Sequence, residues 1–149
     1  MIKLKDLLNE RDYHLTKPPR NVAGVAVVSE GQVLCVKRSE TQGKYPNFWS
    51  LPMGGVERGE TFEQAGAREL KEETGYGARQ VSFLTELSVS PNYMMATTAV
   101  IVASDLYPCR LPGDEPEPIE VIPWSLNEID SLLKHPEFVD SRNIAALLM

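Results

Sequence analysis

Glutamates and an arginine at regular spacing are the residues of this chain best suited to chemistry. They lie in the segment from Gly54 to Tyr76, which reads GGVERGETFEQAGARELKEETGY. On a helix Glu69, Glu72 and Glu73 stand three and four residues apart, so their carboxylates are expected to face one sector. Like charges at this spacing repel unless a cation or an arginine is present, and hard divalent cations take oxygen ligands of this kind. We therefore predict a site for Mg²⁺, with Mn²⁺ as a substitute.

The helix that must carry these carboxylates has its own start and stop signals. Thr61 with Gln64 three residues later forms a capping box, and Gly75 is the natural left-handed residue beyond the last turn. These signals predict a helix from about Phe62 to Thr74.

The same helix should pack on one side and bind on the other. Gly66, Ala67 and Leu70 form a small and apolar sector suited to a sheet, while Arg68 lies four residues before Glu72 and can brace its carboxylate. The alternative is that a helix rich in glutamate is only a solvated face with lysine and arginine partners.

The wider spacing favours the functional interpretation. Three parts of the segment resemble the Nudix box of the Nudix hydrolase superfamily at every charged and glycine position: Gly54, Glu60 and the run Arg68-Glu69-Leu70-x-Glu72-Glu73-x-Gly75. The departures are Tyr76, where the family usually has an aliphatic residue, and Met53, where a glycine commonly precedes the box.

This resemblance implies roles for the box residues. The metal ligands would be the Met53 carbonyl and the carboxylates of Glu69, Glu72 and Glu73. Glu60 and Arg68 would orient the site. The catalytic residues of the box would be Glu72, Glu73 and Arg68. Gly54 and Gly55 would let the loop pass close to metal and phosphate. For the general base we favour Glu115 or Glu117, because related enzymes have a mobile catalytic loop there; the alternative is a solvated, proline-rich turn.

The substrate is predicted from residues outside the box. Pro91, sixteen residues beyond Gly75, resembles the proline that Nudix enzymes acting on ADP-ribose often carry, and Tyr93 resembles a tyrosine of enzymes acting on dinucleoside polyphosphates. Arg38 at a strand end is a candidate phosphate ligand, although an exposed arginine is the commoner situation. Candidates to sandwich an adenine are Phe48, Trp49 and Tyr93, although aromatic residues in such runs more often belong to the core.

The second half of the chain resembles the ADP-compounds hydrolase (NudE-like) branch of the family. The first half, with the segment from Tyr45 to Gly55, is closer to the MutT-like pattern. We therefore expect hydrolysis of a nucleoside diphosphate linked to another group, most simply ADP-ribose, NADH or a diadenosine polyphosphate, giving AMP and a phosphorylated product. The rivals are a MutT-like nucleoside triphosphate pyrophosphohydrolase and a non-catalytic nucleotide-binding sensor, although a sensor tends to lose a box carboxylate.

Apolar runs and turn signals around the box indicate the fold. We expect an N-terminal arm over 1–20 and a hydrolase domain over 21–149. Strands are expected over 21–29 and 32–37 as a hairpin through Glu30-Gly31, and over 80–88, 94–106 and 120–124. A capping box of Ser125 and Glu128 predicts a helix that runs until Pro136, and a last helix starts near Asp140. This order indicates an α+β fold, an α/β/α sandwich, and the resemblance implies a mixed central sheet.

Composition limits the partners and the compartment. A net charge of −6 argues against long nucleic acid, so the partner is expected to be a small nucleotide. There is no run of about 18 apolar residues for a membrane span. Two cysteines in 149 residues are most simply free thiols, which predicts the cytoplasm. In related ADP-ribose hydrolases the N-terminal region helps to build dimers, so a homodimer is a possible assembly.

Overall fold

The computed structural model describes residues 21–41, 45–93, 96–113 and 118–149, so the predicted arm over 1–20 lies outside the described residues. The described elements are β1 (Val22–Ser29), β2 (Gln32–Lys37), β3 (Trp49–Ser50), β4 (Met53–Gly55), α2 (Phe62–Thr74), β5 (Tyr76–Ser88), β6 (Thr97–Pro108), β7 (Glu120–Ser125), the 3₁₀ turn η1 (Leu126–Glu128), α3 (Ile129–Leu133) and α4 (Ser141–Leu148). None of the helices in this described part is long and apolar enough to cross a membrane.

The strands form one mixed sheet, as predicted. Its order is β3-β2-β1-β6-β5, with β4 added to β1 and β7 added to β2. Residues 22–27 of β1 run parallel to residues 98–103 of β6, whereas the other strand pairs are antiparallel. The predicted hairpin from β1 to β2 is confirmed. Glu30 and Gly31 both have a positive φ, 51° and 74°, as the two central residues of a tight hairpin turn often do.

β1 and β2 separate soon after their turn. They pair only at Val28 with Val33 and Ser29 with Gln32. Further along, β2 pairs with β3, while β7 accompanies β2 over its whole length. The freed part of β1 pairs instead with β4, where Ala23 lies opposite Gly54. This exchange of partners places the first glycine of the box against the middle of the sheet.

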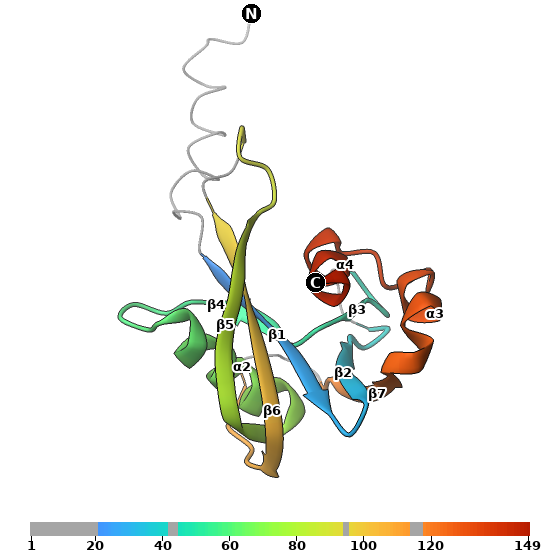
Figure 1. Ribbon diagram of the computed structural model, residues 1–149, viewed down its shortest axis with the longest axis horizontal. Coiled ribbons are helices and arrows are strands. Elements are labelled where there is room, and N and C mark those ends of the chain that lie inside the picture. Colours follow the sequence, from blue (N-terminus) through green and yellow to red (C-terminus); the bar gives the residue numbers. More distant parts are fainter. Residues whose placement is uncertain (1–20, 42–44, 94–95, 114–117) are drawn as a thin grey trace, which may run out of the picture.

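Helices cover both faces of the sheet, which confirms the α/β/α sandwich; Figure 1 shows α2 on one side and α3 and α4 on the other. The residues of β1 alternate accordingly: Val25 packs in the cluster that contains Leu70 of α2, while Ala26 packs with Ala146 of α4.

Helix α2 has the predicted bounds and the predicted capping box. The Gln64 amide donates to Thr61 Oγ1 at 3.2 Å, the Thr61 amide donates to Gln64 Oε1 at 2.9 Å, and Gly75 has a left-handed φ of 78°. Gly66 and Leu70 of the expected packing sector are buried, Ala67 is half-buried, and Ala65 is buried beside them. Gly66 lets the helix approach closely, because a Cβ there would lie 3.1 Å from Ile101.

Three boundaries differ from prediction because tertiary pairing decides them. β5 begins at Tyr76 rather than Gln80, since Tyr76 already pairs with Pro108 of β6. β6 runs to Pro108 for the same reason. Ser125 caps a 3₁₀ turn by accepting from the Asn127 amide, and the following helix ends at Leu133, so the predicted capping box and the continuation to Pro136 were wrong.

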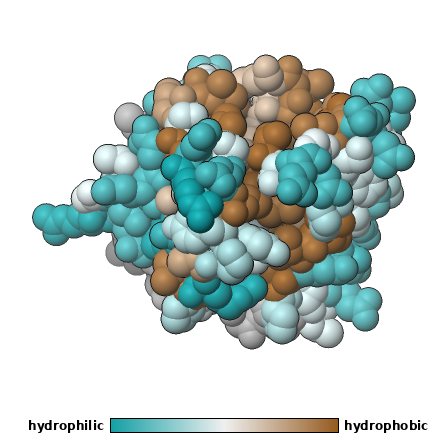
Figure 2. All heavy atoms as spheres, turned by 60° about the horizontal axis from the view of Figure 1, so that its bottom comes forward, coloured by the Kyte–Doolittle hydropathy of each residue, from teal (hydrophilic) through white to brown (hydrophobic). Residues whose placement is uncertain are grey.

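Apolar side chains are not confined to the interior. Figure 2 shows them in several areas on one face among polar residues. Those exposed by 45% or more include Phe83, Leu84 and Val89 of the β5 region. Scattered exposure of this kind is ordinary, whereas its concentration along one strand bears on assembly.

Candidate active site

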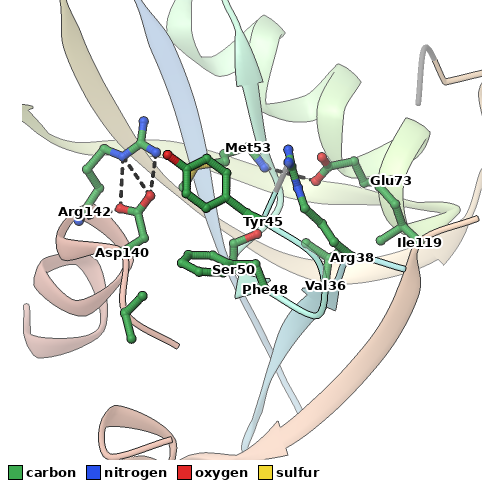
Figure 3. Close-up of a pocket in the computed structure, with 11 residues that line it drawn as sticks. Val36, Arg38, Tyr45, Phe48, Ser50, Met53, Glu73, Ile119, Asp140 and Arg142 are labelled. Atoms are coloured by element: carbon green, nitrogen blue, oxygen red, sulfur yellow. Dashed lines mark hydrogen bonds and ion pairs between the residues drawn. The ribbon is translucent and has the colours of Figure 1, made fainter. Parts of the chain in front are cut away.

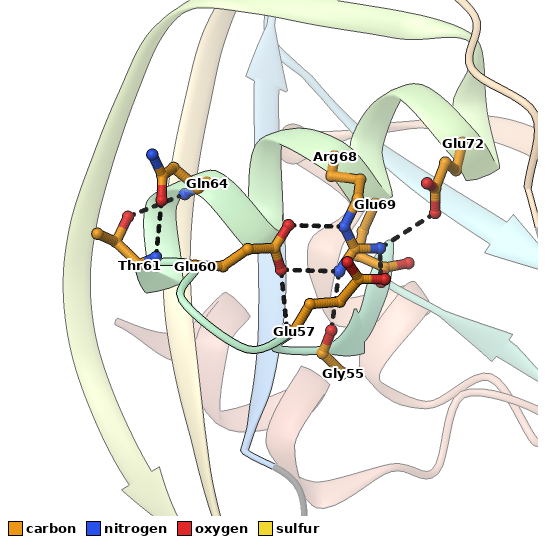
Figure 4. Close-up of polar contacts among 8 residues, drawn as sticks. All are labelled: Gly55, Glu57, Glu60, Thr61, Gln64, Arg68, Glu69 and Glu72. Atoms are coloured by element: carbon orange, nitrogen blue, oxygen red, sulfur yellow. Dashed lines mark hydrogen bonds and ion pairs between the residues drawn. The ribbon is translucent and has the colours of Figure 1, made fainter.

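Arg68 is the centre of the polar network on α2 (Figure 4). Its Nε and Nη2 donate to the two oxygens of Glu60 at 2.8 and 3.0 Å, which is a bidentate pair. Its Nη1 donates to Glu69 Oε1 at 2.6 Å and to Glu72 Oε2 at 3.2 Å. Nη2 also donates to the Gly55 carbonyl at 2.8 Å, so the arginine links the helix to β4.

Ionisation follows from this network. The side-chain hydrogen bond from Arg68 holds the pKa of Glu60 below its ordinary value, assisted by the Glu57 amide, which donates to Glu60 at 2.9 Å. The hydrogen bonds to Glu60 and Glu69, with the charges of these two carboxylates, in turn raise the pKa of Arg68. Glu60 and Arg68 are therefore both charged at neutral pH, as a stable ion pair.

Glu73 contacts β4 at Met53, two residues before the Gly55 carbonyl that Arg68 binds. Its Oε2 accepts from the Met53 amide at 3.0 Å, which links the last carboxylate of the helix to the start of β4. Between them Gly54 makes room for Glu69: a Cβ on Gly54 would lie 2.0 Å from Glu69 Oε1, where no side chain can fit. Glycine at this position is therefore a steric requirement of the predicted ligand.

The three predicted ligands are brought to the same side of α2 but are divided between partners. Glu69 and Glu72 face Arg68, and Glu73 faces the Met53 amide, so within the described ranges no three acidic, histidine or cysteine side chains are grouped so as to hold a metal ion. Guanidinium and amide donors relieve the repulsion that three adjacent carboxylates would otherwise suffer. The donor set fits a hard divalent cation, since it supplies carboxylate oxygens in excess and a backbone loop that passes against them.

A pocket opens beside this site (Figure 3). It has a volume of about 410 Å³, which is within the range of small-molecule sites. One end is formed by Glu73 and Met53 of the box region. The other end holds Asp140 and Arg142, at the start of α4, and the walls are Val36, Arg38, Tyr45, Phe48, Ser50, Ile119 and Val139. A molecule in this pocket would reach from the carboxylate helix to α4.

Comparison with known proteins decides the family. The chain matches the NUDIX domain over residues 17–148. It belongs to the Nudix family. The predicted resemblance, the Nudix fold and the assignment as a pyrophosphohydrolase are thereby confirmed, and enzymes of this family generally use divalent metal ions and act on small nucleotides.

Among relatives within the Nudix family, ADP compounds hydrolase NudE of Escherichia coli (strain K12) is 36% identical over 139 residues, which cover 93% of this chain and 75% of that protein. ADP-ribose pyrophosphatase of Bacillus subtilis (strain 168) is 30% identical over 135 residues, covering 89% of this chain and 72% of that protein. A crystal structure of an ADP compounds hydrolase superposes with a TM-score of 0.81 at 34% identity, covering 89% of this chain and 71% of that one.

The substrate residues predicted outside the Nudix box are scattered. Arg38 lines the pocket, and so does Phe48, whose ring lies 5.2 Å from that of Tyr45. Trp49 belongs to an aromatic cluster with Trp124 and His135, and its Nε1 donates to Glu137, which is the core role considered as the alternative. The structure does not bring Pro91 and Tyr93 to the pocket, because they lie in the turn between β5 and β6, where Tyr93 is 90% exposed.

The two candidates for the general base of this Nudix enzyme, Glu115 and Glu117, lie outside the described residues. Their described neighbours flank the site on both sides. Gly113 lies against Glu72, since a Cβ on it would be 3.7 Å from the Glu72 Cβ, and Ile119 lines the pocket.

The sequence reasoning missed Tyr45, Ser50, Asp140 and Arg142. Asp140 was assigned only as the start of the last helix, a role it does have, because its side chain accepts from the Arg142 amide. No local pattern marks an N-cap as a pocket residue. Tyr45 lies in a polar loop and has a positive φ of 52°, a conformation uncommon for a tyrosine that only the structure reveals.

Proposed function

We propose that the protein hydrolyses, with Mg²⁺ (or Mn²⁺), a nucleoside diphosphate linked to a second group, with ADP-ribose or a related ADP compound as substrate and AMP plus a phosphorylated product. The observation that carries this proposal is the pocket of about 410 Å³, which joins Glu73 and Met53 of the box to apolar and aromatic walls. A nucleoside fits between those walls while its diphosphate reaches the carboxylate helix. The names of the two relatives support ADP-linked substrates.

The residues of the chain have distinct tasks in this reaction. Glu69, Glu72 and Glu73, with the Met53 carbonyl, would hold the divalent ion, which neutralises the diphosphate and lowers the pKa of a bound water. Arg68 positions two of these carboxylates, and Glu60 holds Arg68 in place. Gly54 and Gly55 let the backbone pass against metal and phosphate, and Arg38, between pocket and loop, binds a phosphate oxygen.

The general base is assigned to Glu115 or Glu117. Support comes from the flanking residues, since Gly113 lies at Glu72 and Ile119 lines the pocket. The base must lie within about 2.6–3.2 Å of the attacking water, or act through one further water, so Glu115→Gln and Glu117→Gln should differ in turnover.

Assembly and location complete the proposal. Residues 21–149 are assigned as one hydrolase domain preceded by an arm over 1–20, with Pro91 and Tyr93 as substrate contacts made by a partner chain.

Among the described strands β5 has no neighbour on its outer edge and exposes Phe83 and Leu84, so a homodimer would pair this edge with its copy. Two free thiols favour the cytoplasm. Light scattering of wild type and Leu84→Lys tests the dimer, and a monomeric wild type would contradict it.

A substrate screen tests the reaction. The ratio kcat/KM should be highest for ADP-ribose among ADP-ribose, NADH, diadenosine polyphosphates and 8-oxo-dGTP, with AMP and ribose 5-phosphate as products. Polar groups that fit one nucleotide are left unpaired by the wrong one, so the discrimination should be large. A preference for 8-oxo-dGTP with release of pyrophosphate would replace this substrate by that of a MutT-like enzyme. Binding without turnover of any compound would indicate a sensor.

A further inference from the structure

Asp140 and Arg142 form an ion pair at the end of the pocket opposite Glu73 (Figure 3). Arg142 Nε lies 3.0 and 3.2 Å from the two Asp140 oxygens, and Nη2 donates to Asp140 Oδ2. Asp140 Oδ1 also accepts from the Arg142 amide at 2.9 Å. The side chains of Arg142 and Asp140 are only 28% and 20% exposed, so one edge of the guanidinium is fixed against α4.

The rest of the guanidinium remains available. In the described part of the chain no residue accepts a hydrogen bond from Arg142 Nη1. Figure 3 shows the hydroxyl of Tyr45 directed toward this group, with the ring of Phe48 below it. A planar arginine held in this way offers the N–H groups of Nη1 and one flat face to a ligand.

The charge of the pair indicates the class of ligand. Burial by itself would raise the pKa of Asp140, but hydrogen bonds from Arg142 outweigh it and lower this pKa, so the pair is ionised and carries no net charge at neutral pH. A phosphate has no advantage there, because the Asp140 carboxylate cancels the attraction of the arginine. A neutral, planar group with an acceptor on its edge does fit, since aromatic and apolar side chains line the adjoining walls.

We propose that Arg142, positioned by Asp140, is the residue that selects the nucleobase, by donating from Nη1 to the N1 acceptor of an adenine that lies against Tyr45 and Phe48. This inference rests on the proposed function, whose substrates carry adenosine. Guanine and hypoxanthine carry a hydrogen at N1, so a donor would face a donor. The Asp140 oxygens, already engaged by Arg142, are not free to accept that hydrogen.

The test is calorimetric binding of AMP and IMP without divalent metal, because these two ligands differ only at the base edge. Wild type should prefer AMP. Asp140→Asn/Arg142→Met removes both charges, keeps a good helix cap and retains the apolar part of the arginine. It should weaken AMP binding by roughly 10- to 150-fold, the range for one hydrogen bond to a charged group, and bring the AMP and IMP affinities together.

Arg79→Met is the matched control. It breaks the ion pair of Arg79 with Asp105, at 3.1 Å between β5 and β6, without touching the pocket. Thermal melting verifies folding, and Arg142→Lys, which keeps the charge but loses the fork, should also lose selectivity. Unchanged AMP affinity and unchanged AMP preference in both Arg142 variants would overturn the inference, as would a wild type that binds AMP and IMP equally. Because no hydrolysis is measured in the binding assay, a failure of ADP-ribose as substrate is detected separately.

Discussion

Gly54→Ala tests whether the box loop is shaped around a carboxylate. The added Cβ would lie 2.0 Å from Glu69 Oε1, 2.1 Å from Cδ and 2.3 Å from Oε2. Since ordinary contacts between carbon atoms begin near about 3.5 Å, the whole carboxylate must move by more than about 1 Å. It cannot then keep its 2.6 Å hydrogen bond to Arg68 Nη1. The backbone of β4 is less free to yield, because Gly54 is paired with Ala23 in the sheet.

The expected magnitudes follow from that displacement. A hydrogen bond to a charged group contributes about 1.5–3 kcal/mol. The loss here should lie at the lower end, because Arg68 keeps its hydrogen bonds to Glu60, Glu72 and the Gly55 carbonyl. At about 2–4 °C per kcal/mol for a domain of this size, the melting temperature should fall by roughly 3–6 °C. Displacing a predicted metal ligand should reduce activity by at least roughly 10- to 100-fold, the loss typical of mutating residues that hydrogen-bond to the ligands. Part of the activity should return at high Mg²⁺.

The assay compares kcat/KM over a Mg²⁺ titration, together with thermal melting, for wild type, Gly54→Ala and Gly113→Ala. Gly113 is the control because a Cβ there would be 3.6 Å from the nearest atom of the described residues, an ordinary contact. If Gly54→Ala melts and hydrolyses like wild type at limiting Mg²⁺, then Glu69 is not constrained by the loop and the ligand assignment is refuted.

Three further outcomes are expected. Glu73→Gln, which keeps size but loses charge, should reduce kcat by at least about 10- to 100-fold with the melting temperature little changed; near-normal rates at saturating Mg²⁺ would remove Glu73 from the ligand set. Arg68→Lys should lower the free energy of unfolding at neutral pH, and the difference from wild type should shrink in acid: the lowered pKa of Glu60 contributes stability above its unfolded value of about 4.3, and this contribution is lost as pH falls through the folded pKa; a difference that stays constant with pH would contradict the network. Cys109 should react with a thiol reagent well before Cys35, whose burial raises its pKa to about 12, and equal rates in the native protein would contradict that burial.

Local chemistry explains which features of this protein could be predicted from its residues. Helix α2 begins and ends where its capping box and Gly75 indicate, because caps act over four residues and need no distant partner. The carboxylates share one side of that helix for the same reason, since helical spacing alone determines it. The family follows from these residues together.

Tertiary contacts decided the rest. Arg68 was expected to brace Glu72, but that it also holds Glu60, Glu69 and the Gly55 carbonyl depends on how the loop returns to the sheet. β5 begins early because β6 offers it a partner.

The pocket is the feature that could least be predicted from the sequence. Arg38 and Arg142 lie far apart in the sequence and line the same cavity only because β2 leaves β1 and α4 packs over the opening. Sequence spacing determined which side chains of one helix act together. Which distant side chains face them across a cavity was decided by the packing of sheet and helices, because such contacts are set by strand partners and layer geometry and leave no periodic pattern in the chain.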